Sequence, residues 1–418
     1  MTERPLESFY KVEMGKRREI IGTWAGLDRA ELDMLNKGGL DERTAENMVE
    51  NVIGIFSLPL GIATNIVLNG QEIAVPMVTE ETSVIAAASN AGKMCMETGG
   101  VRAQVQESLT IGQIYIDGLT DYQDAISQIE KNKTRLLDIA NSQDEYLIKL
   151  GGGARDIESR VTELDDTLIL RVHILVDTKD AMGANVVNTM SEAISKKLEQ
   201  ITSGNAVLCI VSNLSDRRLV RATASWNEET LGVDVEKIIK VWNIAKSDPY
   251  RCATHNKGVM NGMTAVAIAT GNDTRALEAA AHSYSFRDGK PCPLTKYRSD
   301  EKGVLYGEIT VPFPLGVFGG ATTVHPLARV NRKILKVETA KELGEVMAAV
   351  GLLQNLAALR ALSKEGIQKG HMRLHAKNTA ISAGAVGDEV ERVASLLTNM
   401  KKFDTDTAKN IIAKLRGR

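Results

Sequence analysis

The sequence is poor in cysteine and has no surplus of charge of either sign, and each shortage excludes a class of protein. Its four cysteines stand singly, so neither a disulfide framework nor a cysteine zinc site is expected. Lysine and arginine number 51 against 53 aspartates and glutamates, which leaves no basic stripe for a phosphate backbone. We therefore expect reduced thiols and no nucleic-acid partner.

Long apolar runs are missing as well. Residues 52–68 are interrupted by Ser57, Pro59, Gly61 and Asn65 and fall short of a membrane-spanning helix, and the opening MTERPLESFY lacks the apolar core of a signal peptide. A hydrophobic share of 43% is typical of globular proteins, and 418 residues exceed the roughly 250–300 at which one core stops growing. These features predict a cytoplasmic protein of two or three domains without membrane contact.

Strand and helix patterns divide the chain into blocks. Residues 72–78 alternate as a strand does and the alanine-rich residues 83–96 are helical, which places Glu80 and Glu81 at a strand-to-helix junction. From about residue 103 the expected elements are a strand pair (106–118), an amphipathic helix (121–143), a long strand (167–177), a helix opened by a loop (180–202) and a strand (205–212). This alternation predicts a small α+β or α/β domain inserted into a larger, mainly helical one.

The two strongest phosphate-binding signatures, G-x-G-x-x-G and G-x-x-x-x-G-K-[ST], do not occur. The best remaining candidate is the small-residue loop from Asp180 to Asn185, whose helix start offers free backbone N–H groups to a pyrophosphate. An ordinary tight loop with Asp180 as a helix cap explains the same residues. The glycines of Gly151–Asp156, with Arg155, form a second and weaker candidate.

The segment from 248 to 284 combines many polar residues with alanine, glycine and methionine. It contains Arg251, His255, Lys257 and Asn261. Each unpaired polar group that is buried costs about 1–3 kcal/mol, so these side chains are either paired or functional. A functional site and an internal polar network that braces helices both remain open. Cys252 lies in this segment, but its neighbours favour packing over the role of a nucleophile.

Two histidines near the C-terminus, His371 and His375, have the i, i+4 spacing of helical metal ligands. Neither H-E-x-x-H nor a nearby acidic ligand accompanies them, so we expect no metal site. Their interest comes from the helical tail that carries them, because a tail joined through Gly370 is suited to act as a lid.

Six motifs, read together and in order, resemble class II hydroxymethylglutaryl-CoA reductase over nearly the whole chain. They are ENVIG (50–54), PMVTEETSVIAAAS (76–89), DAMGANVVNTM (180–190), DPYRCATHNKGVMNG (248–262), GNDTRA (271–276) and GHMRLHAKN (370–378). The resemblance implies a reversible, four-electron reduction of hydroxymethylglutaryl-CoA to mevalonate and coenzyme A by two hydrides from NADH or NADPH, without a metal.

The motif matches imply four catalytic residues, namely Glu81, Lys257, Asp273 and His371. Lys257 would stabilise the oxyanion that hydride addition creates, and Asp273 would keep this lysine ionised and oriented. His371, carried by the closing tail, would protonate the departing coenzyme A thiolate, with His375 as a second candidate. Glu81 would then protonate the aldehyde oxygen in the second hydride step.

The resemblance also implies binding residues, domains and an assembly. Substrate contacts would come from Glu50, Ser83, Arg251 and Asn261, and cofactor contacts from Asp180, Met182, Gly183, Ala184 and Asn185. Asp144 would favour NADH, because an acid beside the adenosine ribose repels a 2′-phosphate. The implied fold class is α+β: a large, mainly helical substrate domain (1–107 and 213–368), an inserted small α+β cofactor domain (108–212) and a helical C-terminal flap (369–418). The family forms homodimers with shared active sites, and in some cases higher oligomers.

Two other functions remain as alternatives. Another CoA-thioester enzyme, such as a lyase or a thiolase-like protein, would need a catalytic cysteine, and no convincing one is present. A regulatory paralogue without activity would be expected to lack charged catalytic residues, whereas all four positions hold ionisable side chains. Oxidation of the cofactor that depends on hydroxymethylglutaryl-CoA would separate the enzyme from both alternatives.

Overall fold

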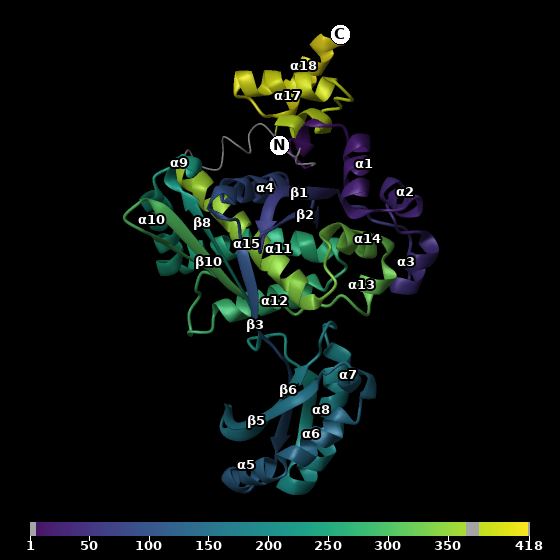
Figure 1. Cartoon of the computed structure of the whole chain (residues 1–418), viewed down its shortest axis with the longest axis vertical. Helices are drawn as coiled ribbons and strands as arrows, with labels where there is room; N and C mark the ends of the chain where they lie inside the picture. The colour runs from purple at the N-terminus through teal and green to yellow at the C-terminus, as the bar shows by residue number, and fades with distance from the viewer. Residues whose placement is uncertain (1–5, 365–375, 417–418) are drawn as a thin grey trace.

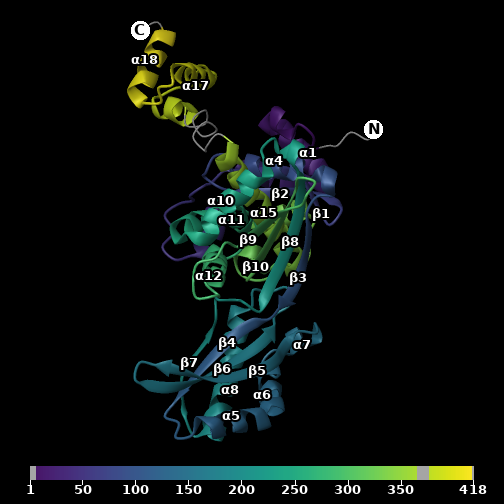
Figure 2. The same ribbon diagram turned by 90° about the vertical axis from the view of Figure 1, so that its left-hand side faces the viewer.

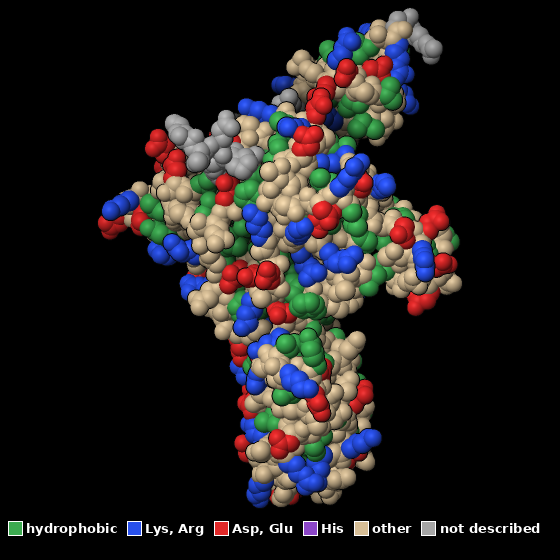
Figure 3. Space-filling model, turned by 45° about the vertical axis from the view of Figure 1, so that its right-hand side comes forward, with side chains coloured by type: hydrophobic (Ala, Val, Ile, Leu, Met, Phe, Trp, Pro, Cys, Tyr) green, Lys and Arg blue, Asp and Glu red, His purple; other side chains and the backbone are tan. Residues whose placement is uncertain are grey.

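The computed structural model describes residues 6–364 and 376–416, and they form an elongated molecule (Figure 1). A helical and sheet-containing body lies in the middle, a smaller unit projects from one end, and the last helices lie at the other (Figure 2). The structure therefore confirms the predicted α+β class. On the face seen in Figure 3, basic and acidic side chains are interspersed, as the balanced composition predicts.

The central body is built around α15 (Ala340–Lys364), which is apolar on nearly all sides and is therefore buried. It packs against α11 (Pro249–Ala269), α4 (Val84–Met94) and one face of a four-stranded antiparallel sheet. The order of this sheet is β3-β8-β10-β9, and its strands are in that order Arg102–Ser108, Arg218–Asn227, Val304–Pro312 and Thr295–Ser299. Among the described residues, α15 is the helix long and apolar enough to span a membrane, but 67% of its most apolar window is buried inside the protein. It is a core helix, which sequence reasoning overlooked.

A second, two-stranded sheet of this body consists of β1 (Leu60–Leu68) and β2 (Gln71–Val78). The remaining elements of the body are α9 (Glu228–Leu231), α10 (Val235–Ser247), α12 (Thr274–Ser285), α13 (Ala321–Val324) and α14 (Pro326–Leu335). Three N-terminal helices pack at its edge: α1 (Met14–Ala25), α2 (Arg29–Lys37) and α3 (Glu42–Met48).

The smaller unit has its own hydrophobic core, between an antiparallel sheet of order β5-β6-β4-β7 and helices that cover one face. Its elements are β4 (Thr110–Asp117), α5 (Tyr122–Lys131), α6 (Lys133–Asn141), α7 (Glu145–Lys149), β5 (Gly153–Leu164), β6 (Thr167–Asp177), α8 (Ala184–Thr202) and β7 (Asn205–Val211). Since every strand pair is antiparallel, the unit is α+β and not α/β.

Two local predictions were wrong. Residues 106–118 do not form a strand pair: β3 joins the sheet of the central body and β4 the sheet of the smaller unit, with Leu109 as the crossover. The helix expected over 121–143 is two helices, α5 and α6, because the chain turns at Asn132, whose φ and ψ of −102° and 8° leave the helical region. The helices of the tail, α17 (Glu389–Met400) and α18 (Thr405–Leu415), have a separate small core.

Candidate active site

Lys257 and Glu81 form the centre of the site. Lys257 Nζ lies 2.9 Å from Glu81 Oε2, and Asn261 Nδ2 donates to Glu81 Oε1 at 3.4 Å. All three line a small hollow of about 130 Å³ with Glu80 and Met260. The lysine and the glutamate expected to be catalytic are therefore in direct contact, although 176 residues separate them in the sequence.

The positions of Glu81 and Lys257 follow from the secondary structure that carries them. Glu81 follows β2 and precedes α4, the strand-to-helix junction that the sequence predicted. Lys257 and Asn261 are four residues apart on α11 and thus share one face of that helix. Asp248 caps α11 by accepting from Tyr250 N. Pro249 is the first residue of α11, and proline suits this position because an N–H group there would have no acceptor within the helix.

Ser83 has an unusual backbone conformation beside Glu81. Its φ of 75° lies in the left-handed region, and as the residue before α4 it makes no side-chain capping hydrogen bond. A non-glycine residue in this region costs roughly 1–2 kcal/mol, and such residues cluster at functional sites. This strain supports the assignment of Ser83 to the substrate site.

Asp273 does not hold Lys257 in this structure, contrary to expectation. Its carboxylate caps α12 by accepting from the backbone N–H groups of Arg275 and Ala276, and it also pairs with the Arg275 side chain at 3.0 Å. The physical reason is local: an acid at the N-cap of a helix accepts from the free N–H groups of the first turn, and this interaction holds the carboxylate at the start of α12. In the structure Glu81, and not Asp273, is the carboxylate paired with Lys257.

Sequence reasoning missed a second acid beside this lysine, Glu278 on α12. It lines the same hollow and accepts hydrogen bonds from Thr264 Oγ1 at 2.6 Å and from His282 at 3.1 Å. Burial pushes the pKa of Glu278 up, but the hydrogen bonds from His282 and Thr264 outweigh it and bring the pKa below its usual value. The i, i+4 spacing of Glu278 and His282 was the only available signal.

Part of the polar segment on α11 is structural. His255 and Asn256 are buried: His255 Nε2 lies 2.7 Å from Thr295 Oγ1, and Asn256 Oδ1 accepts from Leu294 N at 2.9 Å. Cys252 is also buried, and burial raises its thiol pKa, which removes it as a nucleophile. The internal polar network is therefore observed on one face of α11, while a functional site stays a prediction for the opposite face, which carries Lys257 and Asn261.

Stability should fall as the pH is lowered from about 6.5 towards 3, because burial lowers the pKa of His255 to about 3. In this range an unfolded histidine, with a pKa of about 6.5, is protonated while His255 stays neutral. The unfolded state then binds one more proton, so the free energy of unfolding drops by up to about 1.4 kcal/mol per pH unit. Urea unfolding at pH 7 and pH 5 should show a shallower pH dependence for His255→Gln; an equally steep dependence would contradict this assignment.

The candidate cofactor loop lies where the smaller unit meets the central body. Gly183, with a φ of 96°, is the N-cap of α8 and offers no side chain, so Ala184 and Asn185 begin the helix without a side-chain cap. Asp180 does not cap this helix: its carboxylate accepts from Ala340 N at 2.9 Å, at the start of α15. Met182 contributes its carbonyl to a contact with Arg218.

The remaining predicted residues lie apart from the Lys257 hollow. Asp144 caps α7 by accepting from Leu147 N at 2.9 Å. Arg251 precedes Lys257 by six residues of α11, which places it about 240° around the helix and roughly 9 Å along its axis. Glu50 is exposed on the segment between α3 and β1. His371 and His375 are outside the described residues.

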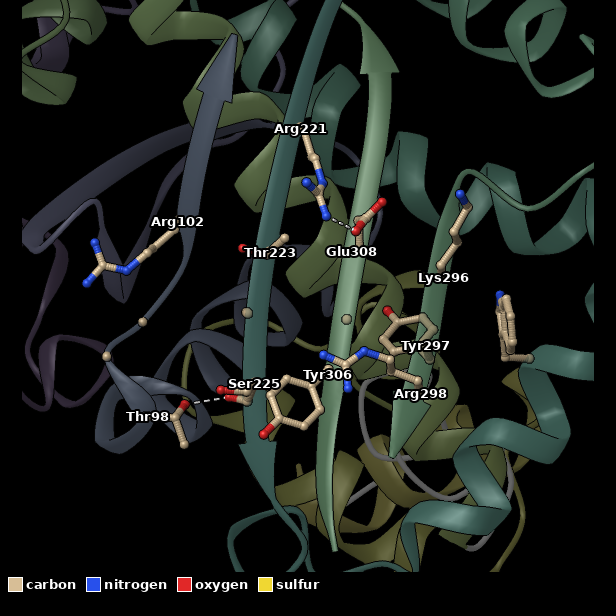
Figure 4. Close-up of a pocket in the computed structure, with 15 residues that line it drawn as sticks. Thr98, Arg102, Arg221, Thr223, Ser225, Lys296, Tyr297, Arg298, Tyr306 and Glu308 are labelled. Carbon is tan, nitrogen blue, oxygen red and sulfur yellow. Dashed lines mark hydrogen bonds and ion pairs between the residues drawn. The ribbon is translucent and has the colours of Figure 1, made fainter. Parts of the chain in front are cut away.

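A larger hollow, of about 610 Å³, lies on the open face of the β3-β8-β10-β9 sheet (Figure 4). Basic side chains point into it from several strands, and one of them, Arg221, pairs with Glu308. The opposite face of this sheet packs on α15, so this hollow is separate from Lys257 and Glu81. Over residues 6–364 and 376–416, no three histidine, cysteine or acidic residues form a group that could hold a metal ion.

Comparison with known proteins shows which protein family the chain is similar to. The family model described as hydroxymethylglutaryl-coenzyme A reductase matches residues 13–376. The chain belongs to this family. It is 48% identical to the 3-hydroxy-3-methylglutaryl-coenzyme A reductase of Archaeoglobus fulgidus, over 98% of this chain and 94% of the relative. A protein of Borreliella burgdorferi described as a probable enzyme of this name is 36% identical, over 79% and 76% of the two chains.

Solved structures of hydroxymethylglutaryl-CoA reductases agree with the sequence comparison. The enzyme of Streptococcus pneumoniae superimposes with a TM-score of 0.84 at 38% identity, covering 98% of this chain and 99% of the other. The same organism's class II enzyme, bound to NADPH in open conformations, gives a TM-score of 0.81, also at 38% identity, over 97% and 100%. The class II resemblance predicted from the six motifs is thus confirmed, and the chain is an NAD(P)H-dependent oxidoreductase of this family.

Proposed function

We propose that this hydroxymethylglutaryl-CoA reductase uses Lys257 where other enzymes use a metal ion. Hydride addition to the thioester carbonyl places negative charge on oxygen, and a fixed ammonium group stabilises that charge. The observation that supports this role is the 2.9 Å contact between Lys257 and Glu81 in an open hollow. After the first hydride, the thiohemiacetal loses coenzyme A to give an aldehyde. A second hydride and a proton then give mevalonate.

Proton transfers are assigned to two other residues. Because Glu81 is in contact with Lys257, its protonated form would donate a proton to the oxygen that Lys257 stabilises, in the second step. His371, in the tail that follows α15, would protonate the coenzyme A thiolate. Asp273 remains a proposed third charged group near Lys257. Direct contact between them would require its carboxylate to exchange Arg275 for the lysine.

Residues 108–212 are proposed to bind the cofactor and the surrounding body to bind the substrate. The start of α8 supports this division, because its first N–H groups have no side-chain cap and suit a pyrophosphate. Met182, Ala184 and Asn185 lie in this region. A cytoplasmic location is inferred from the free state of all four cysteines.

Asp144 is proposed to favour NADH over NADPH. One of its carboxylate oxygens caps α7. The carboxylate keeps its negative charge in this role, and that charge would repel the 2′-phosphate of NADPH. Asp144→Asn keeps a capping oxygen and removes the charge, so kcat/KM for NADPH should rise roughly tenfold, equivalent to about 1.4 kcal/mol, with little change for NADH. Rates with both cofactors, in both directions and with hydroxymethylglutaryl-CoA as the required partner, test the preference. A clear NADPH preference of the unmodified protein would refute it.

A homodimer with shared active sites is proposed from an exposed apolar segment next to Glu50. Ile53 and Phe56 are 105% and 89% exposed, and Val49 is 60% exposed. Adjacent exposed apolar side chains mark interaction surfaces. The Lys257 hollow has a volume of about 130 Å³, whereas a small-molecule site usually has at least roughly 300 Å³. A second subunit would supply the missing walls of the hollow.

Sedimentation tests this assembly. The unmodified protein should sediment as a dimer or a multiple of it, and Phe56→Asp should shift it towards the monomer with loss of activity. Leu164→Asp, at an exposed apolar residue at the end of β5, serves as the matched control and should leave both properties unchanged. A fully active monomer would exclude shared sites.

A further inference from the structure

Arg218 is a fully buried cation at the junction of the two parts of the molecule. Only 1% of it is exposed, and its guanidinium stacks 5.2 Å from the centre of the Phe313 ring. Burial lowers its pKa to about 10, so it remains charged at neutral pH. No acid is bonded to it: its contacts are hydroxyl and carbonyl oxygens.

These oxygens come from three places. Nη1 donates to the hydroxyls of Thr110, the first residue of β4, and Thr178, the residue after β6, at 3.2 and 3.0 Å; both strands belong to the smaller unit's sheet. Nη2 donates to Leu315 O, at 2.8 Å, in the central body. The remaining contacts are with carbonyls of the cofactor loop: Met182 O at 3.0 Å, Ala181 O at 3.2 Å and Lys179 O at 3.5 Å.

The loop carbonyls determine where the loop amides point. In a trans peptide the C=O of one residue and the N–H of the next point in opposite directions. Carbonyls of Ala181 and Met182 turned towards the guanidinium therefore turn the N–H groups of Met182 and Gly183 away from it. Those N–H groups precede the uncapped start of α8, where a pyrophosphate would lie.

A second connection joins this loop to the catalytic residues. Val317 N donates to Asp180 O at 2.8 Å, and Gly316 N donates to Asn272 Oδ1 at 2.8 Å, next to Asp273. Gly316 is required for the close approach, because a Cβ there would lie 2.6 Å from Met182 N. Residues 315–317 thus contact Arg218, the cofactor loop and the residue beside Asp273.

We propose that Arg218 is a positioning residue for the dinucleotide: its buried guanidinium orients the amides of the loop at 180–183 and holds them against the segment that supports Asp273. This inference rests on the proposed cofactor role of that loop. Arginine suits the task because its planar group directs four Nη–H donors, some of them shared between two oxygens, at acceptors from several segments while it stacks on a ring, whereas lysine has three donors on one nitrogen.

The test compares Arg218→Met and Arg218→Lys with the matched control Arg221→Met. Arg221 lies on the same strand, β8, but its side chain is exposed and pairs with Glu308. Binding of NADH is followed by the fluorescence of its dihydronicotinamide, and binding of coenzyme A by calorimetry. We expect Kd for NADH to rise at least tenfold in Arg218→Met and less in Arg218→Lys. Kd for coenzyme A should change less than twofold in each, and Arg221→Met should match the unmodified protein.

A merely structural role would lower the melting temperature without changing Kd for NADH in the folded protein, and that result overturns the proposal. If Arg218→Met does not fold, the test rests on Arg218→Lys and on Gly316→Ala, whose added Cβ would press on Met182 N. Both should weaken NADH binding, and normal binding by both refutes the role. If the unmodified protein itself fails to bind dinucleotide, the proposed function has failed, and not the role of Arg218.

Discussion

Replacement of Lys257 by methionine is expected to lower kcat by about 10²–10³-fold while the protein stays folded. Removal of one group that stabilises an oxyanion typically has an effect of this size, and methionine has nearly the same length without the charge. The fold should survive, because the Lys257 and Glu81 side chains are 61% and 38% exposed and pairs this exposed contribute little to stability. Steady-state rates, with circular dichroism on the same sample, measure both effects.

The control for this experiment is Lys296→Met. Lys296 is exposed on the outer sheet face, in the larger hollow and away from Glu81. It should retain activity within about twofold of the unmodified protein. A Lys257→Met protein with near-normal turnover would remove the central electrostatic argument for this site, whatever the behaviour of the other residues.

Replacement of Glu81 by glutamine should reduce turnover by about 10²–10⁴-fold, the usual contribution of a general acid. Glutamine can still accept a hydrogen bond from Lys257, so the hollow keeps its shape, but its amide cannot supply a proton to the aldehyde oxygen. The defect should therefore be greatest when mevaldehyde is the substrate, because that assay isolates the second hydride step.

Glu80 supplies the matched control for this prediction. It is the preceding residue and lines the same hollow, but it is more exposed, and the carboxylate paired with Lys257 is that of Glu81. Glu80→Gln should keep most of the mevaldehyde activity. Equal losses in the two variants would show that local charge, and not proton transfer from position 81, determines the rate.

Several features of this protein could be predicted from sequence because they depend on nearby residues. The strand-to-helix junction at Glu81 follows from alternation before it and alanine-rich periodicity after it. The 3.6-residue period alone puts Lys257 and Asn261 on one face of α11. The order of strand and helix patterns left α+β and α/β open for the inserted domain, and the α+β class came from the family resemblance. The crossover at Leu109 was not predictable, since a strand that changes sheets has the same alternation as one that does not.

Other features depend on contacts between distant segments. Asp180 caps a helix that begins 160 residues later, and Asp273 is held by the helix that follows it and not by Lys257. The position of Glu278 beside Lys257 depends on how α12 packs on α11. No spacing rule predicts these partners, because hydrogen-bonding groups of many residues compete for each carboxylate and only packing selects one.

The sequence by itself determined the family and the class of fold, and it singled out Glu81 and Lys257 as candidates, because motifs and periodicity are properties of neighbouring residues. Only the tertiary structure decided which charges pair, and that a buried arginine, Arg218, joins the proposed cofactor loop to the central body. A buried cation with no acid bonded to it leaves no pattern in the sequence, since four of its six partners are backbone carbonyls, which every residue has.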